Sequence, residues 1–458
     1  MTKYTKRVLP ALASVVMSSL ALGLAALSTT VRAQDATSAD MTQLIRQGAY
    51  LAQIGDCVAC HTAKDGKPFA GGLPMSISIG TIWSSNITPD KDTGIGSYTL
   101  DDFDRAVRHG IAKNGETLYP AMPYPSYAKV KPSNIKALYA YFMHGVQPVS
   151  QANKTTDIMW PMSMRWPLSV WRKLYAPDVV TDDTPVSATD PVLRGRYLVE
   201  GLAHCSACHT PRKVTMQEAS LSDDGSTFLS GAVIGGYLAK NLRGDVKDGL
   251  GNWSEGDIVA FLKSGRNEHS AAFGGMAEVV QDSTQFMMDS DLMSIATYLK
   301  TLGPAHPDQT SLTYDNATEK MFHDGSASSN GAIQFLNNCA ACHRTTGNGW
   351  NGTFPRLALS TTVNTKDPSS LIRIVLSGAQ MPWTASAPTH YAMPGFADRL
   401  SDQDLADVLT FVRSSWGNTA PAVTSEMVAA VRKSLPEKAP ATDLQTRLIN
   451  GICRSKTR

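Results

Sequence analysis

A five-residue pattern, Cys-x-x-Cys-His, occurs three times in this chain and constrains it more than any other feature. The copies span 57–61, 205–209 and 339–343. This is the attachment signature of c-type haem, in which two thiols add to the haem vinyl groups and the adjacent histidine becomes an axial iron ligand. A thioredoxin-like redox pair or half of a zinc site would be the alternatives. Neither accounts for the fixed histidine or for three copies, so we expect a covalent haem at each.

The pattern assigns the same roles to the residues of each copy. The cysteines expected to bind haem covalently are Cys57, Cys60, Cys205, Cys208, Cys339 and Cys342, and the expected axial histidines are His61, His209 and His343. The motifs use six of the seven cysteines, which excludes a disulfide framework. Cys453 is left over, and a free thiol, a lipid link or a disulfide to a partner stay open for it.

The N-terminus has the features of a secretory signal peptide. Lys3, Lys6 and Arg7 precede an apolar run over 8–27, and small residues follow up to Ala33. We expect cleavage after Ala33, with an uncleaved anchor helix as the alternative. Cleavage leaves 38 basic residues (42 minus 4) against 40 acidic ones, so a nucleic-acid partner is not expected. Export agrees with haem attachment, and no second apolar run is long enough to span a membrane.

The spacing of the motifs indicates a repeated domain. The first cysteines of the three copies are Cys57, Cys205 and Cys339, and such a long, nearly regular period is typical of tandem units. Similar segments precede each copy, beginning at Gly48, Gly195 and Gly331. Each of these segments is predicted to form a short helix that leads into the cysteines.

Two further helices are predicted downstream of each motif. Their apolar residues recur at helical spacing, and Ser or Asp precedes several of them as an N-cap. The predicted ranges are 100–113 and 132–142, 254–262 and 290–299, and 369–376 and 401–412. The sequence therefore predicts an all-α chain with three tandem haem domains joined by long irregular linkers. The predicted boundaries are 1–33 for the signal peptide, 34–150, 191–303 and 326–418 for the domains, 151–190 and 304–325 for the linkers, and 419–458 for the tail.

Two segments outside these domains carry apolar residues. The first linker holds Trp160, Trp166 and Trp171, which suit packing between domains, with a docking site for a membrane or a quinone as the alternative. The tail contains an amphipathic run over 427–431 and a basic end. It could contact a membrane or a partner, and disorder is the alternative.

One methionine lies between the two late helices of each unit. These are Met122, Met276 and Met393, and we expect them to be the second axial ligands of iron. A methionine ligand raises the haem potential and suits an electron carrier, whereas an open position would favour catalysis. The rivals are Met381 in the third unit and, more weakly, Met287 and Met288 in the second.

The remaining candidate residues have no repeated position. The other histidines are His109, His144, His204, His269, His306, His323 and His390; structural roles are expected for them, with a reservation for His390 because it lies near Met393. A Gly-x-Gly-x-x-Gly run over 347–352 matches a dinucleotide fingerprint. It lacks the strand before it and the helix after it that such a site needs.

Several stretches resemble the triple-haem cytochrome c subunits of bacterial membrane-bound dehydrogenases, which serve gluconate, alcohol, sorbitol and fructose. The resemblance covers nearly the whole mature chain and is carried by residues 80–90, 118–125, 164–168, 272–276, 392–396 and 415–418. It is closest to the gluconate 2-dehydrogenase subunit, notably over 106–110 and 190–193. The resemblance implies cytochrome c-type domains, with the family's axial methionines on Met122, Met276 and Met393.

The resemblance also implies a function. An FAD-containing dehydrogenase subunit would oxidise the sugar acid and pass electrons to these haems, which would pass them to ubiquinone. A small third subunit and a place at the periplasmic face of the cytoplasmic membrane are implied too, with no substrate chemistry on this chain. The alternatives are a cytochrome subunit of an alcohol, sorbitol or fructose dehydrogenase, a multihaem peroxidase-like enzyme, and a free-standing soluble carrier.

Overall fold

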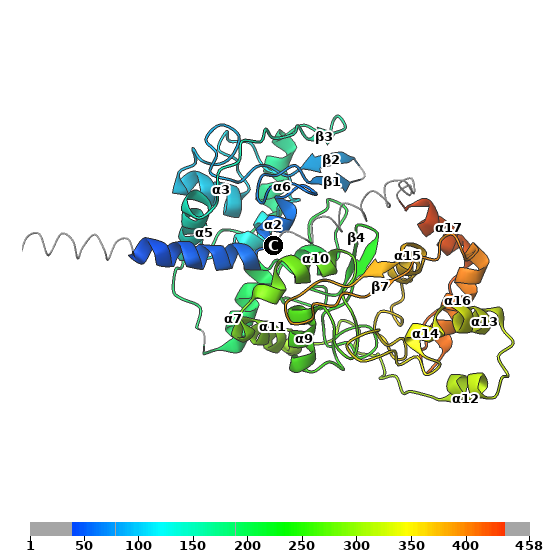
Figure 1. Cartoon of the computed structure of the whole chain (residues 1–458). Helices are drawn as coiled ribbons and strands as arrows, with labels where there is room; N and C mark the ends of the chain where they lie inside the picture. Colours follow the sequence, from blue (N-terminus) through cyan, green and yellow to red (C-terminus); the bar gives the residue numbers. More distant parts are fainter. Residues whose placement is uncertain (1–38, 78, 188, 436–458) are drawn as a thin grey trace, which may run out of the picture. The chain divides into compact units, whose positions relative to one another are not determined.

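The computed structural model describes residues 39–77, 79–187 and 189–435 (Figure 1). The predicted signal peptide and Cys453 lie outside these residues. Helices predominate in the described part of the chain, and seven short strands form three small antiparallel sheets. The predicted helical character is therefore confirmed, but the strands were not expected. Close contacts divide the chain into two units. One ends at Val186 and also takes in Glu200–His204, and the other comprises Ser187–Val199 and the chain from Cys205 onward.

The first unit begins with a helix over residues 39–54, which leads directly into the first Cys-x-x-Cys-His motif. Its further elements are α2 (Cys57–Cys60), β1 (Pro74–Ile77), β2 (Gly80–Trp83), α3 (Leu100–His109), α4 (Tyr124–Tyr127), α5 (Pro132–His144), β3 (Asp157–Ile158) and α6 (Trp166–Tyr175). The predicted helices 100–113 and 132–142 correspond to α3 and α5. Thr99 and Asp102 form a capping box at the start of α3, and Gly110 ends the helix in a left-handed conformation.

The second unit contains the other two motifs. Its elements are α7 (Pro191–Tyr197), a π-helix (Leu198–Leu202), α8 (Ser206–His209), β4 (Ala232–Ile234), β5 (Tyr237–Ala239), α9 (Glu255–Ser264), α10 (Gly275–Asp282), a 3-10 helix (Thr284–Phe286), α11 (Asp289–Thr301), α12 (Ala317–His323), α13 (Asn330–Asn338), α14 (Ala340–His343), α15 (Ser369–Ser377), β6 (Ala379–Gln380), β7 (Ala392–Met393), α16 (Asp402–Ser414) and α17 (Ser425–Lys433). The π-helix is divided between the units, because its residues from Glu200 onward belong to the first unit. Ser254 and Ser401 are the N-caps of α9 and α16, as predicted, and each also forms a capping box.

The same helix crossing occurs before each of the three motifs. A glycine of the leading helix lies directly on the backbone of the last helix of that segment. A Cβ atom built on Gly48 would lie 1.9 Å from the Ala137 oxygen, and one on Gly195 would lie 1.9 Å from the Ser294 oxygen. At Gly331 the corresponding distance to the Asp407 oxygen is 2.4 Å. Only glycine permits this approach, so the segments that precede the motifs are tied to the predicted final helices.

The part of the chain that carries the third motif, here called the third segment, has a continuous core of buried apolar side chains. Phe335 of α13, Leu405 of α16 and Trp416 are completely buried within it. Helix α17 joins the same cluster through Val428, which is also completely buried. The Arg432 side chain fixes α17 by pairing with Asp402 at 2.7 Å. The amphipathic run predicted in the tail therefore packs on this core, and residues 436–458 lie outside the described part.

The predicted first linker is irregular only in part, and as far as Val186 it belongs to the first unit. Its strand β3 pairs with β2, and α6 follows (Figure 1). Polar side chains hold the extended part in place: Gln151 donates to the Ala70 oxygen at 2.8 Å, and Asn153 accepts from the Asn86 amide at 2.6 Å. The polar residues of this segment thus hydrogen-bond it to the first unit. Hydropathy patterns cannot distinguish such a segment from a loose linker.

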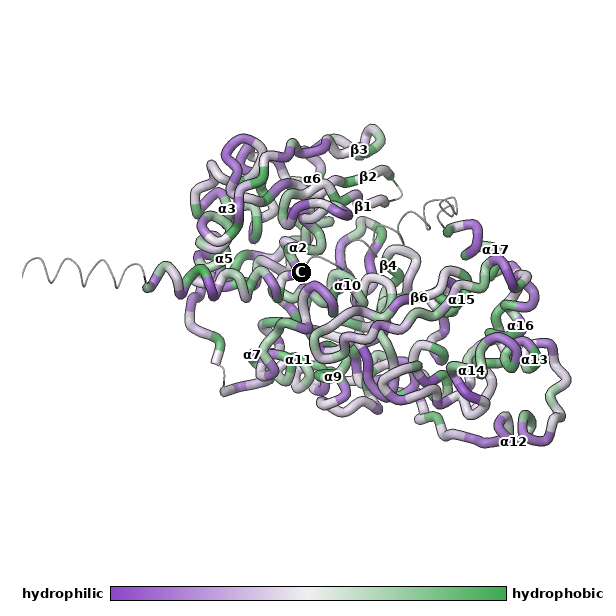
Figure 2. The backbone as a smooth tube through the Cα atoms, in the orientation of Figure 1, coloured by the Kyte–Doolittle hydropathy of each residue, from purple (hydrophilic) through white to green (hydrophobic). Residues whose placement is uncertain are grey.

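The second predicted linker, 304–325, also lies against its unit. The backbone amides of Ala305 and His306 each donate to the buried Asp245 carboxylate at 2.7 Å. Further along, the Tyr314 hydroxyl donates to the Thr346 oxygen at 3.2 Å. Figure 2 shows that the chain around α12 is largely hydrophilic, which explains why the sequence predicts an irregular connection there.

No helix within the described ranges is both long enough and apolar enough to cross a membrane.

Candidate functional site

Each Cys-x-x-Cys-His motif forms a single helical turn. The histidine amide donates to the carbonyl of the first cysteine at 3.0 Å in all three copies, from His61 to Cys57, His209 to Cys205, and His343 to Cys339. Residues three and four positions apart share one helix face. This turn therefore presents both thiols and the imidazole on the same side, as attachment and ligation of one haem require.

The three motif histidines share a second feature, which is a hydrogen bond from the ring to a backbone carbonyl. The Nδ1 atom of His61 lies 2.7 Å from the Ser85 oxygen, and Nδ1 of His209 lies 2.7 Å from the Lys240 oxygen. Nδ1 of His343 lies 2.9 Å from the Pro355 oxygen. Because a carbonyl only accepts, Nδ1 carries the proton, and the lone pair is on Nε2. This is the tautomer and the orientation of a metal-ligating histidine.

Burial keeps these histidines neutral. Desolvation lowers the pKa of His209 to about 4, although the hydrogen bond to the Lys240 carbonyl acts in the opposite direction. Burial likewise lowers the pKa of His61 and of His343. A neutral imidazole is the form that can bind a metal ion, so all three rings are ready for ligation at neutral pH.

The surroundings of the first cysteine of each motif favour the neutral thiol. Burial raises the pKa of Cys57 and of Cys205 to about 12, and that of Cys339 to about 11. Redox catalysis and zinc binding both use the thiolate, which is favoured by a lowered pKa. These raised pKa values argue against the reactive thiolate of a thioredoxin-like pair.

Met122 lies in a loop whose continuation contacts the first motif. Its amide donates to the Tyr119 oxygen at 3.2 Å, and its own carbonyl accepts from the Tyr124 amide at 2.8 Å. Tyr127, at the end of α4, donates its hydroxyl to the Gly55 oxygen at 3.4 Å. The segment that carries Met122 is thus anchored next to the turn that carries the first pair of cysteines.

Met393 lies on β7, which pairs with β6. Gly378 has a φ of +77°, and a Cβ atom there would lie 2.5 Å from the Met393 oxygen, so the glycine permits this close pairing. Met393 and Cys339 both pack against the buried cluster of the third segment. The structure therefore places this methionine and its motif in one core.

Met276 is placed between α9 and α11, as predicted, but it lies in the first turn of an additional helix, α10. Gly274 precedes that helix with a φ of +54° and lies against the Tyr237 ring. Gly274 therefore permits the positive-φ turn that leads into Met276.

The rival methionines have other surroundings. The sulfur of Met381 lies 3.8 Å from Nη1 of Arg266 and accepts its hydrogen bond. Met287 is a core residue with 1% exposure, whereas Met288 is 53% exposed. The Arg266 contact engages the sulfur of Met381, and the assignment of Met122, Met276 and Met393 as axial ligands stays a prediction.

Other histidines have structural partners. His204 approaches the Leu202 oxygen at 3.0 Å and stacks edge-on against Tyr127 at a centroid distance of 5.6 Å. His269 lies 3.3 Å from Asp257 and stacks on Trp253. His390 is exposed. None of these contacts recurs at equivalent positions around the three motifs.

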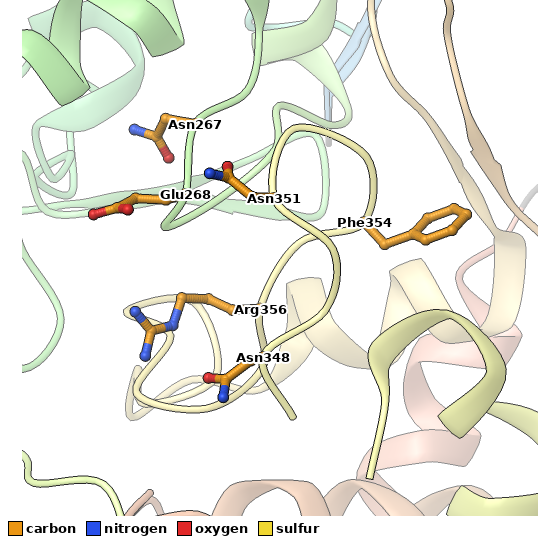
Figure 3. Close-up of a pocket in the computed structure, with 6 residues that line it drawn as sticks. All are labelled: Asn267, Glu268, Asn348, Asn351, Phe354 and Arg356. Carbon is orange, nitrogen blue, oxygen red and sulfur yellow. The ribbon is translucent and has the colours of Figure 1, made fainter. Parts of the chain in front are cut away.

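The glycine-rich run 347–352 is a loop after α14, with no strand before it. Gly347 has a φ of +67° and lies against the Trp416 ring, so it serves packing rather than phosphate binding. The loop contributes Asn348 and Asn351 to a small polar pocket (Figure 3). The other residues that line this pocket are Asn267, Glu268, Phe354 and Arg356.

The carbonyls of Ser85, Lys240 and Pro355 were not found by sequence reasoning. They follow their histidines at unequal intervals. Every residue has a backbone carbonyl, so residue type does not indicate which carbonyl a histidine ring reaches. No sequence pattern could therefore have located them.

Comparison with known proteins decides the family. The cytochrome c family model matches residues 328–416. The chain is 56% identical over 422 residues to the gluconate 2-dehydrogenase cytochrome c subunit of Pantoea cypripedii, covering 91% of this chain and 95% of that protein. The chain belongs to the family of dehydrogenase cytochrome c subunits. Members also include the alcohol dehydrogenase (quinone) cytochrome c subunit of Gluconobacter oxydans (strain 621H), 50% identical over 410 residues, 88% of this chain and 84% of that one.

A third relative is the fructose dehydrogenase cytochrome subunit of Gluconobacter japonicus, which is 37% identical over 412 residues and covers 85% of this chain and 82% of its own length. As a dehydrogenase cytochrome c subunit, the chain uses haem c as its cofactor. The residues fit this group, because each motif places two cysteines and a carbonyl-bound histidine on one helical turn, as haem attachment and iron ligation need.

Proposed function

We propose that this chain carries three covalent c-type haems and transfers electrons from a dehydrogenase subunit to ubiquinone. The covalent bonds would be made by Cys57 and Cys60, Cys205 and Cys208, and Cys339 and Cys342. The axial pairs would be His61 with Met122, His209 with Met276, and His343 with Met393.

The observation that carries this proposal is the recurrence of one local geometry. Each motif histidine directs Nδ1 at a backbone carbonyl within 2.9 Å, whichever residue supplies that carbonyl. A neutral ring that is held in this way presents Nε2 in a fixed direction. Three equivalent sites support three haems of the same ligation rather than one haem and two structural copies.

The residues of the chain suit a relay. Bound haem supplies reversible one-electron exchange between ferrous and ferric iron. The histidine is held by its carbonyl, and the methionine segments are held by their own pairing, such as β7 on β6. Ligands that are fixed before reaction need little rearrangement when the charge on iron changes. A methionine opposite each histidine would also close the iron to peroxide, which disfavours the peroxidase-like alternative.

The oxidation of substrate is assigned to a separate chain. The gluconate 2-dehydrogenase cytochrome subunit gives the highest identity among the relatives named above, which supports an FAD-containing gluconate 2-dehydrogenase flavoprotein as the electron donor. We also assign a small third subunit, a cleaved signal peptide over 1–33 and a place at the periplasmic face of the cytoplasmic membrane.

Haem stoichiometry and substrate reduction test this proposal. The pyridine haemochrome spectrum of the purified chain should give three haems for each polypeptide. Gluconate added to the detergent-solubilised complex should reduce these haems, and a ubiquinone analogue should reoxidise them. Fewer than three haems, or haems that stay oxidised with gluconate while dithionite reduces them, would contradict the corresponding part.

An alcohol dehydrogenase complex is the second candidate, because its cytochrome subunits are 50–51% identical to this chain. The same complex, challenged with ethanol in place of gluconate, separates the two. If ethanol reduced the haems and gluconate did not, the chain would be assigned to an alcohol dehydrogenase complex instead.

A further inference from the structure

A cluster of apolar side chains is exposed on the first unit between β3 and the end of α6. Trp160 is 78% exposed, and Trp166 and Leu174 are each 67% exposed. Met159, Met162 and Val170 are also exposed in this stretch. We call these six residues the tryptophan patch. Large apolar side chains that are exposed together within a short stretch mark a candidate interaction surface.

The backbone below the patch is fixed. The Met159 amide donates to the Ile79 oxygen at 3.0 Å, and the Met164 amide donates to the Pro161 oxygen at 3.1 Å. The Arg165 guanidinium lies 4.1 Å from the centroid of the Tyr119 ring. The exposed side chains therefore sit on a folded base and not on a loose linker.

Helix α6 separates its two apolar faces. Trp171 faces the unit, where it stacks edge-on against Tyr124 at 6.4 Å. Trp166, Val170 and Leu174 follow one another at intervals of four residues and so form one stripe on the exposed side. A helix that only needed to cover the unit would expose polar residues along this stripe.

The charge of the stretch favours an anionic partner. Residues 159–177 contain Arg165, Arg172 and Lys173 and no acidic residue. Lys173 is exposed beside Leu174. Tryptophan favours the boundary between hydrocarbon and headgroups, and basic residues favour anionic lipids. Two highly exposed indoles beside basic side chains combine both preferences.

We propose that the tryptophan patch is a membrane-contact surface, which inserts Trp160, Trp166 and Leu174 into the interface of a bilayer that contains anionic lipid. Lys173 would meet the headgroups. The proposal rests on the proposed function, since a chain that delivers electrons to ubiquinone has to work at the membrane. It adds the surface by which the first unit meets the lipid.

Vesicle binding of the intact haem-loaded chain tests the proposal. The probes are phosphatidylcholine vesicles with and without phosphatidylglycerol, and the readout is the lipid concentration at which half of the chain co-sediments. For the triple variant Trp160→Ser/Trp166→Ser/Leu174→Ser, this lipid concentration should rise at least about tenfold. Lys173→Gln should cost about fivefold, and only on anionic vesicles at low salt.

The matched control is Val214→Ser/Trp383→Ser, which removes one aliphatic and one indole side chain that are also exposed but lie outside the patch. It should bind vesicles like the unaltered chain. Unchanged binding of the triple variant would overturn the proposal. So would normal vesicle binding combined with loss of the dehydrogenase subunit during purification, which would assign the patch to a protein partner.

The reduction of the haems by gluconate in detergent separates the two levels of inference. If the triple variant is reduced normally in detergent but binds vesicles poorly, both the proposed function and the patch are supported. If the unaltered complex is not reduced, the proposed function fails, whereas the vesicle measurement still decides the role of the patch.

Discussion

The backbone oxygen of Lys240 accepts the Nδ1 proton of His209 at 2.7 Å. The ammonium group of the same lysine lies 2.8 Å from the Thr361 hydroxyl and 4.4 Å from the centroid of the Trp253 ring. One residue therefore orients the second motif histidine and also places a positive charge near it. The Thr361 contact ties this site to the segment that carries the third motif.

We predict that Lys240→Met lowers the midpoint potential of the haem bound at His209 by about 30–60 mV. A nearby cation destabilises the ferric state more than the ferrous state, so its removal favours oxidation. Lys240→Arg keeps the charge and should leave the potential close to its original value. Redox titration followed by visible spectroscopy measures both, and equal shifts in the two variants would contradict an electrostatic cause.

Replacing one axial methionine should open one haem. Met122→Ala, Met276→Ala and Met393→Ala should each allow carbon monoxide to bind about one third of the reduced haem, and the potential of that haem should fall. Met381→Ala serves as the control, because its sulfur accepts from Arg266. If Met381→Ala opened a haem and Met393→Ala did not, the ligand assignment for the third motif would be wrong.

The helix crossing before the second motif should not tolerate a side chain. We predict that Gly195→Ala destabilises the second unit by about 1–3 kcal/mol, because its Cβ would lie 1.9 Å from the Ser294 oxygen and the helices would have to separate. Gly256→Ala lies in α9 with no atom closer than 3.6 Å and should be neutral or stabilising. Denaturant unfolding followed by circular dichroism measures the difference, and equal midpoints for the two variants would refute the packing argument.

The buried Asp245 carboxylate should make the second unit sensitive to acid. Burial acts to raise its pKa, but hydrogen bonds from the Ala305 amide, the Asn241 side chain and the His306 amide outweigh it and hold the pKa below its ordinary value. The folded state thus binds the proton less well than the unfolded state. The stabilisation is complete above about pH 4 and is lost as the pH falls through the folded-state pKa.

Asp245→Asn tests this sign. The variant should lose about 1–3 kcal/mol of stability at neutral pH, since the hydrogen bonds to a charged acceptor become weaker. The gap between the variant and the unaltered protein should narrow in acid, where the carboxylate of the latter is protonated. Thermal unfolding across the acid range gives both curves, and a gap that stayed constant would show that Asp245 acts through its shape alone.

Much of the local structure could be predicted from the chain. The capping boxes at Ser254 and Ser401 and the apolar spacing after them placed α9 and α16 within a few residues. Prediction was weaker where polar residues form long-range bonds. The segment after Ser150 looked irregular, yet Gln151 and Asn153 bind it to the first unit. Such bonds depend on which distant carbonyls fold back, and composition does not record this.

The sequence by itself determined the cofactor chemistry, because Cys-x-x-Cys-His is local: five consecutive residues in one helical turn bring thiols and imidazole to one face. Family membership was predicted from short sequence stretches and was confirmed by comparison with known proteins. Only the tertiary structure decided which carbonyl orients each histidine, which methionine is already engaged by Arg266, and which face of α6 remains exposed. These features depend on contacts between residues far apart in the chain. A backbone carbonyl is the same in every residue, so the sequence does not indicate which one accepts from a histidine.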